Sequence, residues 1–519
     1  MSPSPAESMI KAASLAIAGH KAEALAELCG ARDEGRRTAA LLDAIGHLQF
    51  ELRHFDAAAR TYDEALSANR DDSLAHYNRG VCLEKRHSWE EARAAFQRAI
   101  ELDSRRASAH LGLGIAQLQL AQPAAALDAF DQCLERQPFR ETALRGRAVA
   151  LHLLDRHQDA SEQYRKLLSR DPASEELLRN ALSLAIAQGD YESVAEYSSR
   201  LLEIDRMSIL ALEGAALAAF ARRDFDGALR FCTTLVEAHP AHAAGWFNCG
   251  VACQKLGFFE KAAAAYSRAA AIDPESAEAF LGLGTVLQES GAWEAARQAY
   301  ERALALVPHL KTALWNLALL FEKSKELRKA EQLYVRLVEQ YPDAQEAWFR
   351  LGYARLQLEE LPACIQAFEA CLALGRKCPE AQLNIGVAYW KMREIEKARD
   401  AFRQSLGSSH KTTALRYLAA IALRQQDYEQ ALTLHKQLLE CDAQDADLLY
   451  NTALLLQKRG RAADAVRYYR QALAARADFP QALLNLGHAL MSLGRHEEAQ
   501  QAWQSALRGN VELAEQFLV

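Results

Sequence analysis

Small, apolar and polar residues follow a 34-residue period along this chain. Residues 243–276 and 277–310 align without a gap, with small residues at the eighth and twentieth places, an aromatic at the twenty-fourth and proline at the thirty-second. Within each segment, apolar residues recur three and four positions apart, which places them on one face of an α-helix. In residues 243–276 the two apolar stripes contain Trp246, Gly250 and Cys253, and then Ala262, Tyr266 and Ala269. The pattern predicts two amphipathic helices per segment, packed as an antiparallel pair.

The same frame covers nearly the whole sequence. It predicts fifteen repeats, the last of which ends near Leu513, and they begin at residues 5, 39, 73, 107, 141, 175, 209, 243, 277, 311, 345, 379, 412, 446 and 480. The step from 379 to 412 is one residue short. We expect the missing residue to shorten a loop near residues 405–411.

Three places in the repeat carry a clear physical meaning. Glycine stands at the eighth place of eight repeats, and alanine stands at the twentieth place of thirteen of the fifteen. We expect these small residues to let the two helix backbones approach, so that a bulky side chain there costs about 1 to 3 kcal/mol through overpacking. Proline cannot continue a helical hydrogen-bond ladder and marks where the second helix ends. Six prolines stand at the thirty-second place: Pro138, Pro172, Pro240, Pro274, Pro308 and Pro342.

These features resemble those of the tetratricopeptide repeat family, over almost the whole chain. The resemblance implies an all-α fold, a right-handed superhelical α-solenoid of about fifteen 34-residue helix-turn-helix repeats. First helices would line a concave groove and second helices would form the convex side. One helix pair cannot bury its own apolar face, which is why such units stack into a one-dimensional array.

The strength of the pattern divides the chain into five segments. We expect an N-terminal cap with a degenerate repeat at 1–38, regular repeats at 39–174, degenerate repeats at 175–242, and repeats with a binding groove at 243–513. A C-terminal tail follows at 514–519. This tail either covers the last repeat as a short helix or docks elsewhere through its apolar end.

The degenerate repeats at 175–242 allow two interpretations. Leu182 replaces the small eighth residue, Val194 replaces the alanine, and Ser198 and Cys232 replace the aromatic. Looser or differently angled packing is expected there. Ordinary drift within the array explains these changes, and the alternative is a flexible joint between an N-terminal and a C-terminal arm.

Composition narrows the classes of function. Of the 519 residues, half are apolar, and 61 Lys plus Arg stand against 68 Asp plus Glu. The formal net charge of −7 disfavours a nucleic-acid partner. Ten scattered cysteines favour a reducing compartment, so we expect a cytoplasmic protein. No stretch approaches the ~18 to 20 apolar residues of a membrane-spanning helix, so we expect no membrane insertion.

No motif in the sequence indicates catalysis. The zinc-protease, nucleophile-elbow and phosphate-loop patterns are absent. Gly112-Leu113-Gly114 imitates a dinucleotide fingerprint but lies inside a first helix with no strand before it. Cys249, Cys253, Cys364 and Cys371 fall on core places and are expected to be buried thiols, whereas Cys378 does not. We therefore expect a protein that is not an enzyme, with no catalytic residue, no cofactor and no metal.

The exposed stripe of the first helices carries the candidate partner-binding residues. Asparagine recurs at the sixth place with a lysine seven residues later, on the same helix face. These pairs are Asn248 with Lys255, Asn316 with Lys323, Asn384 with Lys391, and Asn451 with Lys458. Aromatic residues stand beside them: Phe247, Trp315, Phe349, Trp390 and Tyr450. The alternative is that asparagine and lysine at these places are simply solvated.

This stripe predicts a protein or peptide partner. A carboxamide can both donate to and accept from a peptide backbone, and aromatic rings supply contact area, while lysines favour acidic or phosphorylated guests. The pattern is similar to the asparagine-lined grooves of O-linked N-acetylglucosamine transferase and kinesin light chain superhelices. The sequence therefore predicts a non-catalytic scaffold that binds an extended or helical segment in the concave groove. The alternative is an accessory subunit that tethers a glycosyltransferase or a secretion or assembly machinery through its convex surface.

Overall fold

The computed structural model describes residues 5–33, 37–375, 378–407 and 410–508. Within these residues it contains thirty α-helices, one short 3-10 helix and no strand. The prediction of an all-α fold built from helix pairs is therefore confirmed. The tail expected at 514–519 lies outside the described residues, as do parts of the expected N-terminal cap.

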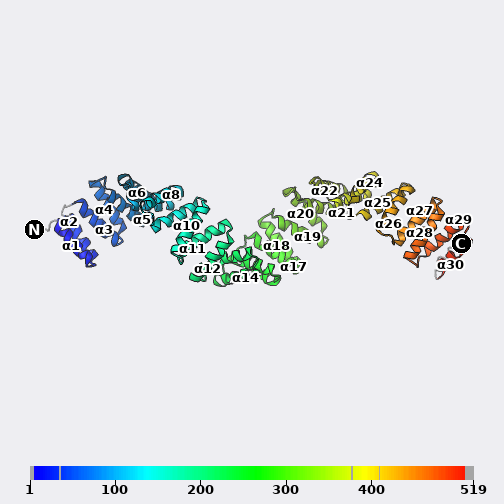
Figure 1. The fold of residues 1–519 in the computed structure, drawn as a ribbon, viewed down its shortest axis with the longest axis horizontal. Coiled ribbons are helices and arrows are strands. Elements are labelled where there is room, and N and C mark those ends of the chain that lie inside the picture. Colours follow the sequence, from blue (N-terminus) through cyan, green and yellow to red (C-terminus); the bar gives the residue numbers. More distant parts are fainter. Residues whose placement is uncertain (1–4, 34–36, 376–377, 408–409, 509–519) are drawn as a thin grey trace. The chain divides into compact units, whose positions relative to one another are not determined.

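The chain divides into two compact units, Met1–Ile272 and Asp273–Val519, and in each unit the helices follow one another as antiparallel pairs (Figure 1). The first unit contains α1 (Pro5–Ile17), α2 (Lys21–Asp33), α3 (Ala39–Glu51), α4 (Phe55–Ala68), α5 (Ser73–Lys85), α6 (Trp89–Leu102), α7 (Ala107–Gln119), α8 (Pro123–Arg136), α9 (Glu141–Leu153), α10 (His157–Arg170), α11 (Glu175–Gln188), α12 (Tyr191–Ile204), α13 (Ile209–Ala221), α14 (Phe225–Ala238), α15 (Ala243–Lys255) and α16 (Phe259–Ile272). The second unit contains α17 (Ala277–Glu289), α18 (Trp293–Leu306), α19 (Lys311–Lys323), α20 (Leu327–Gln340), α21 (Gln345–Gln357), α22 (Leu361–Ala373), α23 (Pro379–Lys391), α24 (Ile395–Gln404), η1 (Ser405–Gly407), α25 (Lys411–Arg424), α26 (Tyr428–Cys441), α27 (Ala446–Lys458), α28 (Ala462–Ala475), α29 (Pro480–Ser492) and α30 (His496–Leu507).

The turn between the two helices of a repeat has the same backbone geometry throughout the described residues. The residue at the fifteenth place has a positive φ in all fifteen repeats, as in Gly257 at 78° and Arg223 at 59°. A left-handed residue after a helix lets the chain reverse while its amide groups bond to the last carbonyls of that helix. This turn therefore recurs at the same place of the 34-residue period in every repeat.

The one-residue slip in the frame changes the end of a second helix. Helix α24 is 10 residues long, and the three residues of η1 continue it as a 3-10 turn. Most other second helices have 14 residues. The expectation was a shortened loop near 405–411; residues 408–409 of that loop lie outside the described residues, and within the described residues the change lies at the end of the helix.

The core of each repeat is organised around the twentieth and twenty-fourth places. The twentieth-place side chain is fully buried in every repeat, including Val194 and Cys364. The aromatic at the twenty-fourth place lies against the eighth place of its own repeat and the sixth place of the next. A Cβ added to Gly80 or to Gly112 would come within 2.7 or 2.5 Å of the Phe96 ring. The eighth-place glycine thus packs directly against this ring, a contact that the sequence pattern did not identify.

Leu182 restores the packing of the degenerate repeats at 175–242. The smaller Ser198 stands where other repeats carry an aromatic ring, and both Leu182 and Ser198 are fully buried. A Cβ added to Gly214 would meet the Ser198 Oγ at 2.5 Å and the Leu182 Cδ1 at 3.1 Å. The leucine therefore fills volume that the missing ring leaves. Both boundaries of this segment fall inside the first unit.

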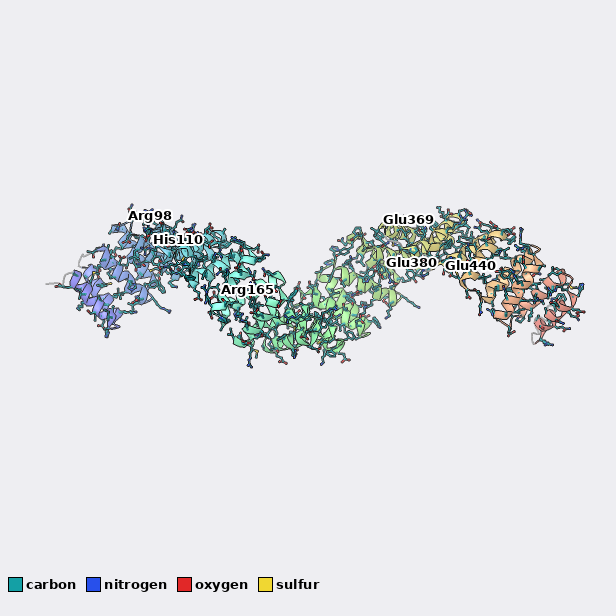
Figure 2. All side chains as sticks on the ribbon, viewed as in Figure 1. Arg98, His110, Arg165, Glu369, Glu380 and Glu440 are labelled. Atoms are coloured by element: carbon teal, nitrogen blue, oxygen red, sulfur yellow. The ribbon has the colours of Figure 1, made fainter. Side chains whose placement is uncertain are left out.

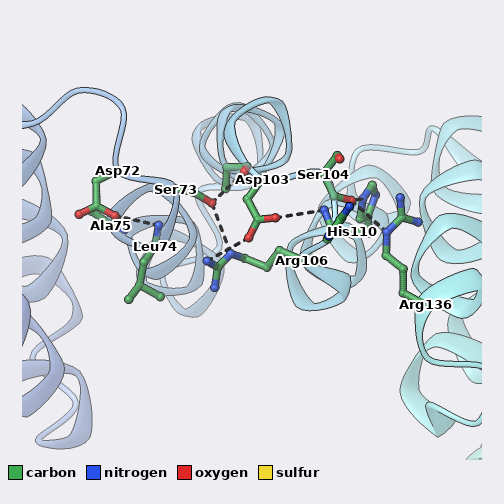
Figure 3. Close-up of polar contacts among 11 residues, drawn as sticks. Asp72, Ser73, Leu74, Ala75, Asp103, Ser104, Arg106, His110 and Arg136 are labelled. Atoms are coloured by element: carbon green, nitrogen blue, oxygen red, sulfur yellow. Dashed lines mark hydrogen bonds and ion pairs between the residues drawn. The ribbon is translucent and has the colours of Figure 1, made fainter.

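Polar contacts at the loops that join successive repeats are shown in Figure 3 for two such junctions. Asp72 caps α5 by accepting hydrogen bonds from the amides of Leu74 and Ala75. The carbonyl of Ser104 lies 3.1 Å from Nε2 of His110 and accepts a 2.9 Å hydrogen bond from Nε of Arg136, which stands 32 residues further on. The Ser104 contacts thus join the loop before α7 to α7 and to the end of α8, in the next repeat.

Candidate interaction face of the first helices

The first helices form the inner side of each unit. Within the first unit α5 approaches α7 and α7 approaches α9, and within the second unit α21 approaches α23. Successive second helices approach each other less closely. Each unit therefore curves toward its first helices, and side chains at their fifth and ninth places lie on the inner face. We call this surface the first-helix face.

The fifth-place aromatic residues are half-buried on this face. Each packs at a steep angle against the buried aromatic of its own repeat. The pairs, with the distance between ring centroids, are Phe247 with Tyr266 at 5.5 Å, Trp315 with Tyr334 at 6.0 Å, Phe349 with Phe368 at 5.5 Å and Tyr450 with Tyr469 at 5.9 Å. Trp390 stands at the twelfth place and packs instead against the half-buried Tyr417 of the next repeat, at 6.2 Å. Phe247 belongs to the first unit and the others to the second. Fixed rings with one exposed side provide contact area at little cost in side-chain entropy.

The asparagines at the sixth place fall into two groups. Asn316 Nδ2 donates to the Tyr300 hydroxyl at 3.4 Å, and that hydroxyl donates to Gln288 Oε1 at 3.0 Å. Asn316 thus supports a buried tyrosine. Among the four candidate asparagines, all of which lie in the described residues, the other three have no hydrogen-bond partner in the protein: Asn248, Asn384 and Asn451. The sequence contains a signal for this division that the repeat pattern did not reveal. Asn316 follows a tyrosine by sixteen residues, whereas the other three asparagines follow Cys232, Phe368 and His435 at the same distance.

The four candidate lysines are the last residues of their first helices. A cation at this end is favoured by the helix dipole. Lys323 Nζ lies 3.7 Å from the centroid of the Trp293 ring, and Lys458 Nζ lies 4.9 Å from that of Tyr428. Lys391 Nζ pairs with Glu359 at 3.2 Å. These three lysines contact the preceding repeat and not the asparagine of their own helix, while all four, including Lys255, remain exposed.

A cleft opens on the first-helix face of the second unit. It has a volume of 430 Å³ and lies where α19 and α21 begin. Trp315 and Thr312 line one side, and Ala347 and Glu346 line the other. The cleft brings a candidate aromatic residue next to a space that accepts a side chain of a guest.

The cysteines singled out in the sequence are structural. Cys249, Cys253, Cys364 and Cys371 are at most 5% exposed, as predicted, and Cys378 is half-buried. Burial raises the pKa of Cys364 to about 12, so its thiol stays protonated at neutral pH. Among the described residues no group of three His, Cys, Asp or Glu side chains is placed to hold a metal ion. No described helix has the length and apolar character needed to cross a membrane.

Two family models described as tetratricopeptide repeat match most of the sequence. One matches residues 44–109, 111–175, 213–277, 254–311, 281–345, 316–381 and 383–446. The other matches residues 456–515.

Solved structures that match this chain are distant in sequence. The APC/C hetero-tetramer Cut9–Hcn1 matches at 16% identity, over 88% of this chain and 96% of that chain, with a TM-score of 0.29. Naa15/Naa10 bound to HypK-THB matches at 13% identity, over 99% and 95%, with a TM-score of 0.34. PilF of Pseudomonas aeruginosa matches at 24% identity, over 39% and 92%, with a TM-score of 0.31. At these values the likeness carries no information about what this chain binds.

Proposed function

This chain belongs to the tetratricopeptide repeat family, and from that premise we propose that it is a non-catalytic scaffold whose first-helix face binds an extended or helical segment of a partner protein. The second unit contributes Asn316, Asn384, Asn451, Lys323, Lys391, Lys458, Trp315, Phe349, Trp390 and Tyr450, and the first unit contributes Asn248, Lys255 and Phe247.

The observation that carries this proposal is the series of half-buried aromatic residues on the first-helix face of the second unit, where Trp315, Phe349 and Tyr450 each pack against a buried ring. Aromatic side chains in fixed positions are the commonest energetic centres of protein interfaces. The cleft beside Trp315 offers room for an apolar side chain of the guest. Asn384 lies on the same face with a carboxamide that no other described group of the protein engages, so it is free to bond to a guest backbone.

A peptide-selection experiment tests the proposal. Random 20-residue peptides are selected against the immobilised full chain, and their affinities are measured by fluorescence anisotropy. We expect Asn384→Ala to weaken binding about three- to tenfold, because one backbone hydrogen bond is worth roughly 0.5 to 1.5 kcal/mol. The variant should melt like the wild type, since it removes no internal hydrogen bond.

The matched control is Glu369→Lys, an exposed change on second helix α22 (Figure 2). It should leave affinity unchanged. Asn316→Ala is unsuitable for this purpose, because it also removes the donor to Tyr300. The proposal fails if no peptide is selected, or if the selected peptides bind Asn384→Ala and Trp390→Ala as tightly as the wild type.

A second candidate function uses the opposite surface. A cleft of 510 Å³ lies between second helices α26 and α28, lined by Lys436, Glu440, Leu449, Tyr468 and Gln471. This cleft supports the alternative that the chain is an accessory subunit, which tethers a glycosyltransferase or a secretion or assembly machinery through its second helices. Selected peptides that lose binding on the charge reversals Lys436→Glu and Glu440→Lys, and keep it with Asn384→Ala, would favour this candidate.

A further inference from the structure

A cleft lined by arginine lies on the second helices near the C-terminal end of the second unit. It has a volume of 410 Å³ and lies between α28 and the start of α30. Ala463, Val466 and Ala474 of α28 line its apolar part. Its polar lining consists of Arg467, Arg470, Gln471 and Arg495, with no carboxylate among the lining residues.

One carboxylate serves two of these three arginines. Glu498 accepts from Nη2 of Arg470 at 2.5 Å and lies 2.6 Å from Nη2 of Arg495. Hydrogen bonding to Arg495, aided by the charge of Arg470, lowers the pKa of Glu498, so this carboxylate stays ionised at neutral pH. A guanidinium has five N–H donors, and one carboxylate cannot occupy those of two arginines.

Arg467 adds a cation with no carboxylate partner among the described residues. Its guanidinium carbon lies 5.3 Å from the centroid of the neighbouring Tyr468 ring, and the side chain is exposed. Three guanidinium groups thus face one carboxylate. Among these four side chains the excess is two positive charges, with unused N–H donors on the cleft.

We propose that this cleft binds a phosphate monoester carried by a protein segment, such as a phosphorylated serine or threonine. A phosphate monoester carries about −1.5 to −2 charges at neutral pH, which matches the local excess, and three acceptor oxygens for guanidinium forks. A carboxylate side chain supplies half that charge and one fewer oxygen. A nucleic-acid strand needs a continuous series of cations, and this chain has a net charge of −7.

This site is separate from the first-helix face, because its residues lie on second helix α28 or, for Arg495, directly before second helix α30. The proposal therefore does not depend on the groove function. A scaffold with both sites would hold an unmodified segment on its first helices and respond to phosphorylation of a partner on its second helices.

Anisotropy with a labelled peptide of five residues, alanines flanking one central phosphoserine, tests the site on the full chain. We expect saturable binding by the wild type, no measurable binding of the unphosphorylated peptide, and at least tenfold weaker binding after Arg467→Gln combined with Arg495→Gln. The matched control Arg165→Gln neutralises an exposed arginine of the first unit (Figure 2) and should change nothing. Circular dichroism melting of each variant verifies that the fold is retained.

Competition with inorganic phosphate separates two sources of the ligand. If the phosphopeptide binds more tightly than inorganic phosphate, the site recognises a phosphorylated segment. If both bind equally, the cleft is a phosphate site whose ligand is the free ion. The proposal is overturned if the wild type does not bind the phosphopeptide, if the arginine variants bind it unchanged, or if a 20-nucleotide RNA binds in preference.

Discussion

The residue at the twenty-fourth place decides how the polar groups of a repeat are arranged. A tyrosine there buries its ring, and in four repeats its hydroxyl donates to an acceptor at the twelfth place of the same repeat. The acceptors are Gln254 for Tyr266, Gln288 for Tyr300, Glu322 for Tyr334 and Gln457 for Tyr469. A phenylalanine needs no such partner, so the first helix beside it is free to carry other side chains.

Histidine takes this place in one repeat, and its burial makes stability depend on pH. His435 is 5% exposed, and its Nδ1 lies 3.1 Å from Oγ1 of Thr452. The Thr452 hydroxyl donates to the Leu448 carbonyl at 2.7 Å, so Nδ1 of His435 is the donor in the pair. Burial lowers the pKa of His435 below its ordinary value.

We expect acid to destabilise this part of the second unit. Because the folded pKa of His435 is depressed, its contribution is fully present above the unfolded pKa of about 6.5 and is lost as pH falls through and below that value. Thermal unfolding of the wild type and of His435→Phe at pH 7.5 and 5.0 measures this. The variant should lose less stability than the wild type between the two pH values.

The comparison of His435→Phe with the wild type isolates one histidine. Burial also lowers the pKa values of His110 and His152 in the first unit, and both remain in the variant. An identical pH dependence of the two proteins would show that His435 does not contribute.

At the scale of the element, the turn inside each repeat is held by one left-handed residue. Glycine occupies this place in six repeats and other residues occupy it in nine. An L-residue in the left-handed region costs roughly 1 to 2 kcal/mol, because its Cβ crowds the backbone. The nine other residues are therefore kept there by packing of the two helices that the turn joins.

Exchanging residues at this place should change stability in opposite directions. We expect Gly257→Ala to lower the free energy of unfolding by about 1 to 2 kcal/mol, through backbone strain alone, because an added Cβ has no atom within 4 Å. Arg223→Gly should raise it by up to about 1 kcal/mol, since relief of strain exceeds the entropy cost of glycine. Urea unfolding measures both, and a change of the same sign in the two variants would contradict the argument.

At the scale of the whole molecule, contacts run from each helix to its neighbours in the chain. Helix α12 packs on α11 and α13, and α13 packs on α14. Stability in such an array is a sum over repeats and their nearest interfaces. A weak interface would therefore appear as a local region of low protection.

For the segment 175–242, ordinary sequence drift and a flexible joint predict different rates of backbone hydrogen exchange. We expect its backbone amides to exchange as slowly as those of α7 to α10, because Leu182 replaces the volume of the missing ring and is fully buried. Hydrogen exchange followed by mass spectrometry resolves the two segments. Faster exchange confined to 175–242 would establish a joint.

Much of the fold could be predicted because the same apolar spacing and the same small residues recur in each repeat. The period placed the helix starts, the buried alanines and the thiols of Cys249 and Cys364. The ring that packs against Gly80 was not predicted, because it comes from Phe96, sixteen residues later. Helical periodicity assigns a residue to a face but does not identify which side chain meets it across the interface.

The sequence by itself determined that the chain folds into stacked helix pairs, because apolar spacing and turn chemistry act over a few residues. Tertiary structure decided which polar groups remain for a partner. Asn316 and Asn384 occupy the same place in their repeats, yet only the first bonds to a buried tyrosine. Likewise Arg467, Arg470 and Arg495 come from two helices, and their shared cleft and shared carboxylate arise only when those helices pack. Local propensity is encoded within a segment, whereas a binding site depends on distances between segments.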